Sequence, residues 1–254
     1  MRRVLVAVFF GWTVLVAGCR PLPEVRIPLD SVVSRNGGKV VLVLLPGRGD
    51  RMDSFEKKGF TTMILRSGLP VDVIAADATE EYYADGSFVT RLREDVVLPA
   101  RRGGYGGVWL IGISMGGTGA LLYEREHPGE VDGVIAFAPY LGEEKVAEEI
   151  AQAGGLSRWR FEPRDTGRHS LAEGRMRDLY RWFGDRMQNE KAGRIYLCYG
   201  TRDRFARGAG ILASTLPEGQ TLTVAGGHDW RTWKKLLRRL LAEQGLRNRM
   251  TRPE

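Results

Sequence analysis

The chain has 254 residues, of which 43% are hydrophobic and 27% charged, so it can bury a core large enough for one α/β domain. Two cysteines are too few for a disulfide framework, and the formal net charge of +7 comes without a recognised nucleic-acid-binding motif. The sequence holds no internal repeat, phosphate-binding loop, dinucleotide fingerprint or cluster of metal ligands. We therefore expect no nucleic-acid partner, no metal and no other cofactor.

The first residues have the pattern of an export signal. Arg2 and Arg3 precede an apolar run at 4–16, which is short for a membrane span, and small residues then lead to Cys19. The sequence Val-Ala-Gly-Cys at 16–19 resembles the bacterial lipobox. This resemblance implies that the chain is cleaved before Cys19 and that the Cys19 thiol is acylated. An uncleaved membrane anchor is the alternative interpretation.

The remaining chain divides into a tether, one domain and a tail. We expect the lipoprotein signal peptide at 1–18, a tether with one edge strand at 19–37, the domain at 38–246 and a basic C-terminal tail at 247–254. Lipidation would anchor the domain in the bacterial cell envelope, on the periplasmic side. The residue after the cysteine is Arg20 and not an aspartate. In a lipoprotein of a bacterium with two membranes, this is compatible with transfer of the protein to the outer membrane.

Short apolar runs alternate with helix-like stretches through the domain. This alternation predicts an α/β fold with a doubly wound, mostly parallel sheet. Cys198 lies inside one of the runs and is expected to be a small core residue. Candidate strands lie at 40–45, 71–75, 108–111, 133–137, 195–199 and 222–224.

A G-x-S-x-G sequence follows the strand expected at 108–111. Such a turn, between a strand and a helix expected at Thr118–Arg125, exposes a serine hydroxyl and is called a nucleophile elbow. Ser114 would be the nucleophile, and the N–H of Met115 would point at a developing oxyanion. The alternative is a glycine-rich turn whose serine only caps the helix.

A serine nucleophile needs a histidine base and a carboxylate that holds it. Of the three histidines, His127 sits near a helix end and His169 in an arginine-rich stretch, whereas His228 follows a strand. Asp203 also follows a strand, and its alternative role is to cap a helix at 204–214. Asp229 is adjacent to His228 and therefore badly placed to bond its ring. The candidate triad is Ser114, Asp203 and His228.

The loop after the strand at 40–45 is the candidate source of a second oxyanion donor. It reads Pro-Gly-Arg-Gly-Asp at 46–50, and the backbone N–H of Arg48 would supply the hydrogen bond.

These motifs together resemble a known superfamily. The loop at 46–50 is similar to the HG-x-GD loop of carboxylesterase and lysophospholipase-type α/β-hydrolases, with Pro46 where many relatives carry histidine. Gly226-Gly227-His228-Asp229-Trp230, with Trp233, is similar to the histidine segment of esterase D and S-formylglutathione hydrolase-like esterases. The resemblance spans about Lys39 to Leu241.

The resemblance implies an α/β-hydrolase fold and a serine esterase that cleaves carboxylic esters, and by extension thioesters, through an acyl-enzyme. The partners it implies are a small-molecule or lipid ester as substrate and a membrane held through Cys19. Two alternatives stay open. One is an acyltransferase that uses the same triad, and the other is a non-catalytic, lipid-anchored binding module.

Family members often carry a lid where this chain has a long insertion at about 142–193. The segment from Arg158 to Arg186 holds eight arginines and the aromatic residues Trp159, Phe161, Trp182 and Phe183. It is either a mobile lid that offers guanidinium groups to an anionic substrate, or a helical cover with aromatics on the core and solvated arginines. The helix expected at 230–241 has one apolar and one basic face, and the apolar face should pack on the sheet.

Overall fold

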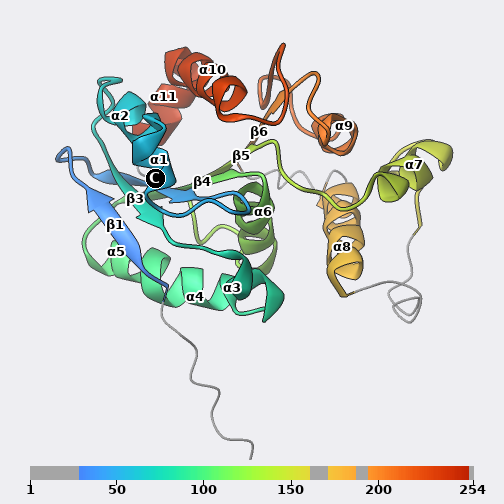
Figure 1. The fold of residues 1–254 in the computed structure, drawn as a ribbon, viewed down its shortest axis with the longest axis horizontal. Coiled ribbons are helices and arrows are strands. Elements are labelled where there is room, and N and C mark those ends of the chain that lie inside the picture. Colours follow the sequence, from blue (N-terminus) through green and yellow to red (C-terminus); the bar gives the residue numbers. More distant parts are fainter. Residues whose placement is uncertain (1–28, 161–170, 187–193, 252–254) are drawn as a thin grey trace, which may run out of the picture.

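The computed structural model describes residues 29–160, 171–186 and 194–251. The signal peptide at 1–18, Cys19, most of the tether, and His169 and Phe161 of the insertion lie outside these residues. Figure 1 shows the described part as a sheet with helices on both faces.

Seven strands form one sheet in the order β1-β3-β2-β4-β5-β6-β7. Only β1 is antiparallel to its neighbour, so the expected mostly parallel, doubly wound sheet is confirmed. The strands are β1 Ser31–Ser34, β2 Val40–Leu45, β3 Val71–Ala76, β4 Gly107–Ile113, β5 Gly133–Phe137, β6 Ile195–Gly200 and β7 Thr221–Val224.

Helices cover both faces of the sheet (Figure 1). Helices α1 Ser54–Lys57, α2 Phe60–Leu65, α10 Trp230–Ala242 and α11 Gln244–Thr251 lie on one face. The other face carries α3 Glu80–Ala84, α4 Phe88–Leu92, the π-helical turn η1 Arg93–Val97, α5 Leu98–Arg102, α6 Met115–Glu126, α7 Glu144–Gln152, α8 Leu171–Arg186 and α9 Ala206–Ala213.

The alternation along β2 builds the two halves of the core. Val41, Val43 and Leu45 belong to the cluster beneath α6, and Val40, Leu42 and Leu44 belong to the cluster beneath α10. All six side chains are at most 2% exposed, which explains why the run contains no polar residue. Cys198 is buried in the second cluster, where burial raises the pKa of its thiol.

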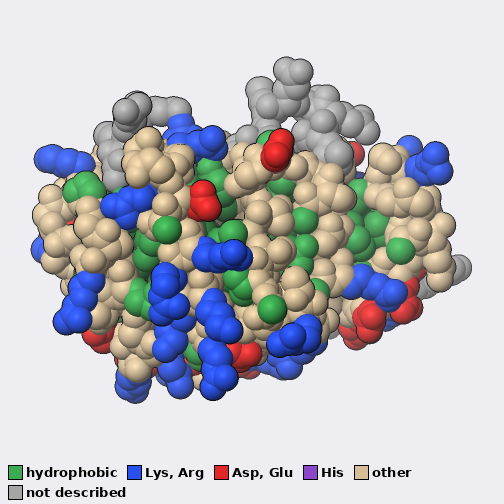
Figure 2. Space-filling view, turned by 90° about the horizontal axis from the view of Figure 1, so that it is seen from above, with side chains coloured by type: hydrophobic (Ala, Val, Ile, Leu, Met, Phe, Trp, Pro, Cys, Tyr) green, Lys and Arg blue, Asp and Glu red, His purple; other side chains and the backbone are tan. Residues whose placement is uncertain are grey.

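The two faces of α10 separate as expected. Trp233, Leu236, Leu237, Leu240 and Leu241 are buried against the sheet. The opposite side of the helix exposes Arg231, Lys235, Arg238 and Arg239. Figure 2, which views the molecule from the side of α10 and α11, shows Lys and Arg side chains gathered on this face.

The edge strand expected in the tether is present and belongs to the sheet, whereas the C-terminal boundary differs from the expected one. The tether contributes β1, and Leu29 is only 4% exposed in the core, so the sheet begins before residue 38. The tail at 247–254 is not separate from the domain either, because α11 runs through residue 251 and Met250 is fully buried. Helix α6 begins at Met115, three residues before the expected Thr118.

The described part of the insertion is a packed cover. Trp159 and Phe183 are buried in the same cluster as α6, in agreement with the cover interpretation. The expectation of solvated arginines is wrong for Arg177, which is 3% exposed and donates to Glu149 on α7 at 2.7 Å. Burial of a guanidinium requires such a partner. Among the described helices, none combines the length and apolarity that a membrane crossing requires.

The burial of Met250 generates a prediction. Met250→Ala should lower the free energy of unfolding by about 2–3 kcal/mol, because it removes a filled core position. Lys235→Ala on the exposed face of α10 should change it by less than about 0.5 kcal/mol. Urea unfolding followed by tryptophan fluorescence measures both, and equal effects of the two substitutions would mean that α11 is not packed on the domain.

Candidate active site

Ser114 occupies a tight turn between β4 and α6. Its backbone has φ of 52° and ψ of −113°, a conformation that residues other than glycine rarely adopt. Two flanking glycines make the turn possible by letting backbones touch. A Cβ on Gly112 would lie 2.0 Å from the carbonyl oxygen of Gly116, and one on Gly116 would lie 2.2 Å from that of Leu45. The turn therefore has the geometry of a nucleophile elbow.

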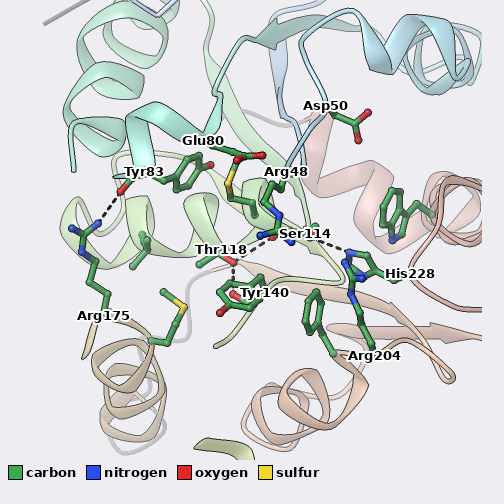
Figure 3. Close-up of a pocket in the computed structure, with 16 residues that line it drawn as sticks. Arg48, Asp50, Glu80, Tyr83, Ser114, Thr118, Tyr140, Arg175, Arg204 and His228 are labelled. Atoms are coloured by element: carbon green, nitrogen blue, oxygen red, sulfur yellow. Dashed lines mark hydrogen bonds between the residues drawn. The ribbon is translucent and has the colours of Figure 1, made fainter. Parts of the chain in front are cut away.

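The structure brings the three candidate triad residues together. His228 Nε2 lies 3.0 Å from Ser114 Oγ, as Figure 3 shows. On the other side of the ring, Nδ1 lies 3.0 and 2.9 Å from the carboxylate oxygens of Asp203. With its proton on Nδ1, the histidine donates to Asp203 and can accept the hydroxyl proton of Ser114.

Asp203 is held in place by the backbone that follows it. Its side chain is fully buried, and Oδ1 accepts a hydrogen bond of 2.8 Å from the N–H of Phe205. The alternative in which Asp203 caps the next helix is wrong, because α9 begins at Ala206 with Phe205 as its N-cap. The carboxylate therefore fixes both the loop after β6 and the imidazole.

His228 is oriented by the loop between β7 and α10. Asp229 caps α10 by accepting from the N–H of Thr232 at 2.9 Å, so it is not the partner of the histidine, as the sequence predicted. The rings of Phe205 and Trp233 contact the imidazole edge-to-face, with centroids 4.9 and 5.1 Å away. These contacts limit rotation of the ring.

The loop carrying Arg48 lies beside the serine. A Cβ on Gly47 would be 3.4 Å from the Cβ of Ser114, so the backbone approaches the nucleophile closely. Arg51, later in the same loop, donates from Nε to both oxygens of Asp77 at 2.8 and 2.9 Å. Asp77 also accepts from the N–H of Met52 at 3.0 Å.

Asp77 is a residue that the sequence analysis missed. It directly follows β3 and is 5% exposed, and the hydrogen bonds from Arg51 lower the pKa of its carboxyl. A carboxylate just beyond the carboxyl end of a strand was the available signal. Through Arg51 it ties the loop after β2 to the end of β3.

A cavity of about 680 Å³ opens at Ser114. Ser114, Met115, Arg48 and His228 line it, together with residues that the sequence did not single out, including Tyr83, Tyr140, Arg175 and Met176. Figure 3 shows Ser114 and His228 at one end and Arg175 at the other.

The other candidate groups lie elsewhere. His127 follows the last residue of α6, and its ring contacts Tyr123 with centroids 5.2 Å apart. It does not line the cavity. Within the described ranges, no three His, Cys, Asp or Glu side chains gather in a way that could hold a metal ion.

The fold and the site define an α/β-hydrolase, and comparison with known proteins specifies the family. The family model Esterase, described as "Putative esterase", matches residues 96–243. These residues are more than half of the chain and include Ser114, Asp203 and His228. The chain belongs to this family. It is therefore a serine esterase of the α/β-hydrolase superfamily and a carboxylic-ester hydrolase.

Solved structures share the fold at low sequence identity. Est1E from Butyrivibrio proteoclasticus is 14% identical with a TM-score of 0.64, over 88% of this chain and 95% of that one. An S-formylglutathione hydrolase from Staphylococcus aureus is 13% identical with a TM-score of 0.55, over 82% of each chain. MGS-MChE2, an α/β hydrolase from a sediment metagenome of the Mar Chica lagoon, Morocco, is 18% identical with a TM-score of 0.57, over 87% of this chain and 97% of that one. A search of curated proteins finds no match.

Asp77 generates a prediction on activity and pH. Asp77→Asn should lower kcat for a p-nitrophenyl ester about tenfold, less than the roughly 10²–10³-fold loss that follows removal of an oxyanion donor, because the loop shifts but keeps its amides. Stopped assays at neutral pH measure this effect, with the exposed Asp53→Asn as the charge-matched control.

The stability of the same variant should depend on pH in a defined direction. The folded-state pKa of Asp77 is lowered from 3.8, so its ionised form stabilises the protein above that pH, and this contribution is lost as the pH falls through the lowered pKa. The difference in free energy of unfolding between wild type and Asp77→Asn should therefore be constant around neutral pH and should become smaller as the pH falls below 3.8. A difference that widens on acidification would contradict the assigned ion pair.

Proposed function

We propose that the protein hydrolyses carboxylic esters through an acyl-enzyme on Ser114. One observation carries the proposal: the hydrogen-bonded series Ser114, His228 and Asp203 lies at the wall of a cavity in a member of an esterase family. In this proposal His228 is the general base and acid, and Asp203 stabilises the imidazolium.

The proposed mechanism has two half-reactions, acylation of Ser114 and hydrolysis of the acyl-enzyme. Ser114 Oγ attacks the acyl carbon while its proton passes to His228 Nε2, 3.0 Å away. The tetrahedral intermediate collapses, the bond to the alcohol oxygen breaks, and Nε2 returns the proton to that oxygen. Water then enters, gives its proton to Nε2 and its oxygen to the acyl carbon, and the carboxylic acid leaves as Ser114 regains its proton. Asp203 stays ionised throughout.

Two backbone amides would stabilise the oxyanion. The N–H of Met115 lies in the first turn of α6, where the helix leaves its amides without partners. The N–H of Arg48 comes from the loop that approaches Ser114, and each such donor is worth about 3–4 kcal/mol in the transition state. Neither role depends on the Arg48 side chain.

The alternatives differ in the donor or the acceptor of the acyl group. A thioester would acylate the same serine, and an acyltransferase would pass the acyl group to an alcohol instead of water. Product analysis with glycerol or ethanol present separates transfer from hydrolysis. A non-catalytic binding module predicts that a fluorophosphonate probe labels neither wild type nor Ser114→Ala, whereas the proposal predicts labelling of wild type alone.

The triad generates a prediction. Alanine at Ser114, His228 or Asp203 should each reduce kcat for a short p-nitrophenyl ester by about 10⁴-fold or more, because the three groups act as a unit. For the same reason, the double variants should be little worse than the worst single one. Steady-state kinetics with protein of verified fold measures this, and multiplicative losses in the double variants would contradict the assignment.

We further propose that acylation of Cys19 holds the protein in the bacterial cell envelope. The support is the lipobox-like sequence at 16–19 and the apolar run before it. An acyl chain anchors a protein by burying its methylenes, and stable anchoring takes more than one chain.

The anchor generates its own prediction. Cys19→Ala should abolish incorporation of labelled palmitate and release the protein from the membrane fraction. Cys198→Ala is the matched control, since its thiol is buried in the core and should leave incorporation unchanged. Palmitate incorporation that persists in Cys19→Ala would assign the lipid to another residue, and membrane retention without lipid would indicate an uncleaved anchor.

A further inference from the structure

Arginine side chains line both ends of the cavity (Figure 3), and two carboxylates are also part of its lining. Arg48 and Arg204 line it with Ser114 and His228, and both are exposed. Arg175 lies at the opposite end (Figure 3). Glu80 and Asp50 also line the cavity, and Glu80 is exposed.

Arg175 differs from Arg177 and Arg181, the other arginines of α8 whose side chains the structure describes. It is half-buried, and Nη1 donates to the backbone carbonyl of Tyr83 at 3.1 Å. Arg177 pairs with Glu149 and Arg181 with Asp178, whereas no described carboxylate forms an ion pair with Arg175. A half-buried guanidinium keeps donors to offer, and a carboxylate is the group that matches its fork.

Helix α6 gives the scale of the cavity. Ser114 precedes the helix, and Thr118 and Leu122 line the same cavity one and two turns later. Eight residues at about 1.5 Å each place Leu122 about 12 Å from Ser114 along the axis. Tyr83, whose carbonyl holds Arg175, reaches the middle of the helix, since a Cβ on Gly119 would lie 2.4 Å from its hydroxyl.

The part of the cavity along α6 fits the acyl side of a substrate. His228 must return its proton to the leaving alcohol, so the alcohol lies on the His228 side of Ser114. Figure 3 shows Arg175 on the other side of Ser114 from His228. The apolar groups of Met115, Leu122 and Met176 are part of the same cavity lining.

We propose that Arg175 selects esters whose acyl chain ends in a carboxylate, such as half-esters of linear dicarboxylic acids. The chain lies along α6, and the terminal carboxylate accepts hydrogen bonds from the guanidinium. This inference rests on the proposed acyl-enzyme function and adds the substrate class. Glu80 is exposed, so solvent screens its repulsion of the carboxylate more than it screens the half-buried Arg175.

The experiment compares kcat/KM for p-nitrophenyl half-esters of succinate, adipate, suberate and sebacate with that for the same compounds capped as methyl esters. In wild type, the ratio of free acid to capped ester should rise with chain length until the carboxylate reaches Arg175. Arg175→Gln should lower the ratio at that length at least tenfold and leave the succinate ratio unchanged, and Arg175→Lys should restore part of it. Arg181→Gln, on the same helix but outside the cavity, should leave every ratio unchanged.

Variants at the other charges sharpen the test. Glu80→Gln should raise the ratio for the anionic esters, because it removes a like charge. Esters of ω-amino acids should be poor substrates, and a preference for them over the half-esters would overturn the proposal. If Arg175→Gln lowers kcat/KM equally for free and capped esters and also lowers the unfolding midpoint, the proposal is overturned. Arg175 then has only a structural role, as the hydrogen-bond donor that joins α8 to Tyr83.

Failure of this inference can be told apart from failure of the proposed function. If wild type releases p-nitrophenolate from the acetate ester and Ser114→Ala does not, the acyl-enzyme function stands whatever the half-esters show. If neither protein acts on any ester, the proposed function itself fails.

Discussion

Close backbone contact at the start of α6 is the constraint on which the site depends. Gly112, Gly116 and Leu45 approach so closely that no side chain fits at either glycine. This contact locks β4, α6 and the end of β2 together around Ser114. The strained serine backbone is tolerated because its neighbours leave no other path for the chain. This close packing fixes the position of the nucleophile independently of His228 and Asp203.

The parallel sheet then supplies the partners. Strands β2, β4, β6 and β7 are parallel, so their carboxyl ends lie along the same side of the sheet. The loops after them therefore bring together four residues: Gly47, Ser114, Asp203 and His228. Ser114 and His228 are 114 positions apart in the chain, yet each is placed by a short loop. The hydrogen bond from Phe205 to Asp203 and the edge-to-face rings around His228 reduce the freedom that these loops would otherwise have.

The sequence predicted those parts of the protein that repeat a local pattern. Most buried strands are continuous apolar runs, and a triad residue lies in the loop after each of three strands, so both could be identified without coordinates. Arg175 and Tyr83 could not, because their meeting across 92 residues is a tertiary contact with no local pattern. Asp77 and Arg51 were missed although the strand end before Asp77 was visible. Helix α11 was taken for a tail because only Leu246 and Met250 mark its buried side.

Strand β1 has a consequence for the solubility of shortened forms of this protein. It is four residues long and covers the outer edge of β3, whose Val73, Ile74 and Ala75 are all buried. Its own Val32 and Val33 are 51% and 43% exposed. A short strand of this kind blocks pairing between sheet edges of different molecules. A polypeptide that started at residue 38 would leave β3, a six-residue and mostly apolar strand, as an unpaired edge, and we expect it to aggregate through that edge even though every residue of the triad is present.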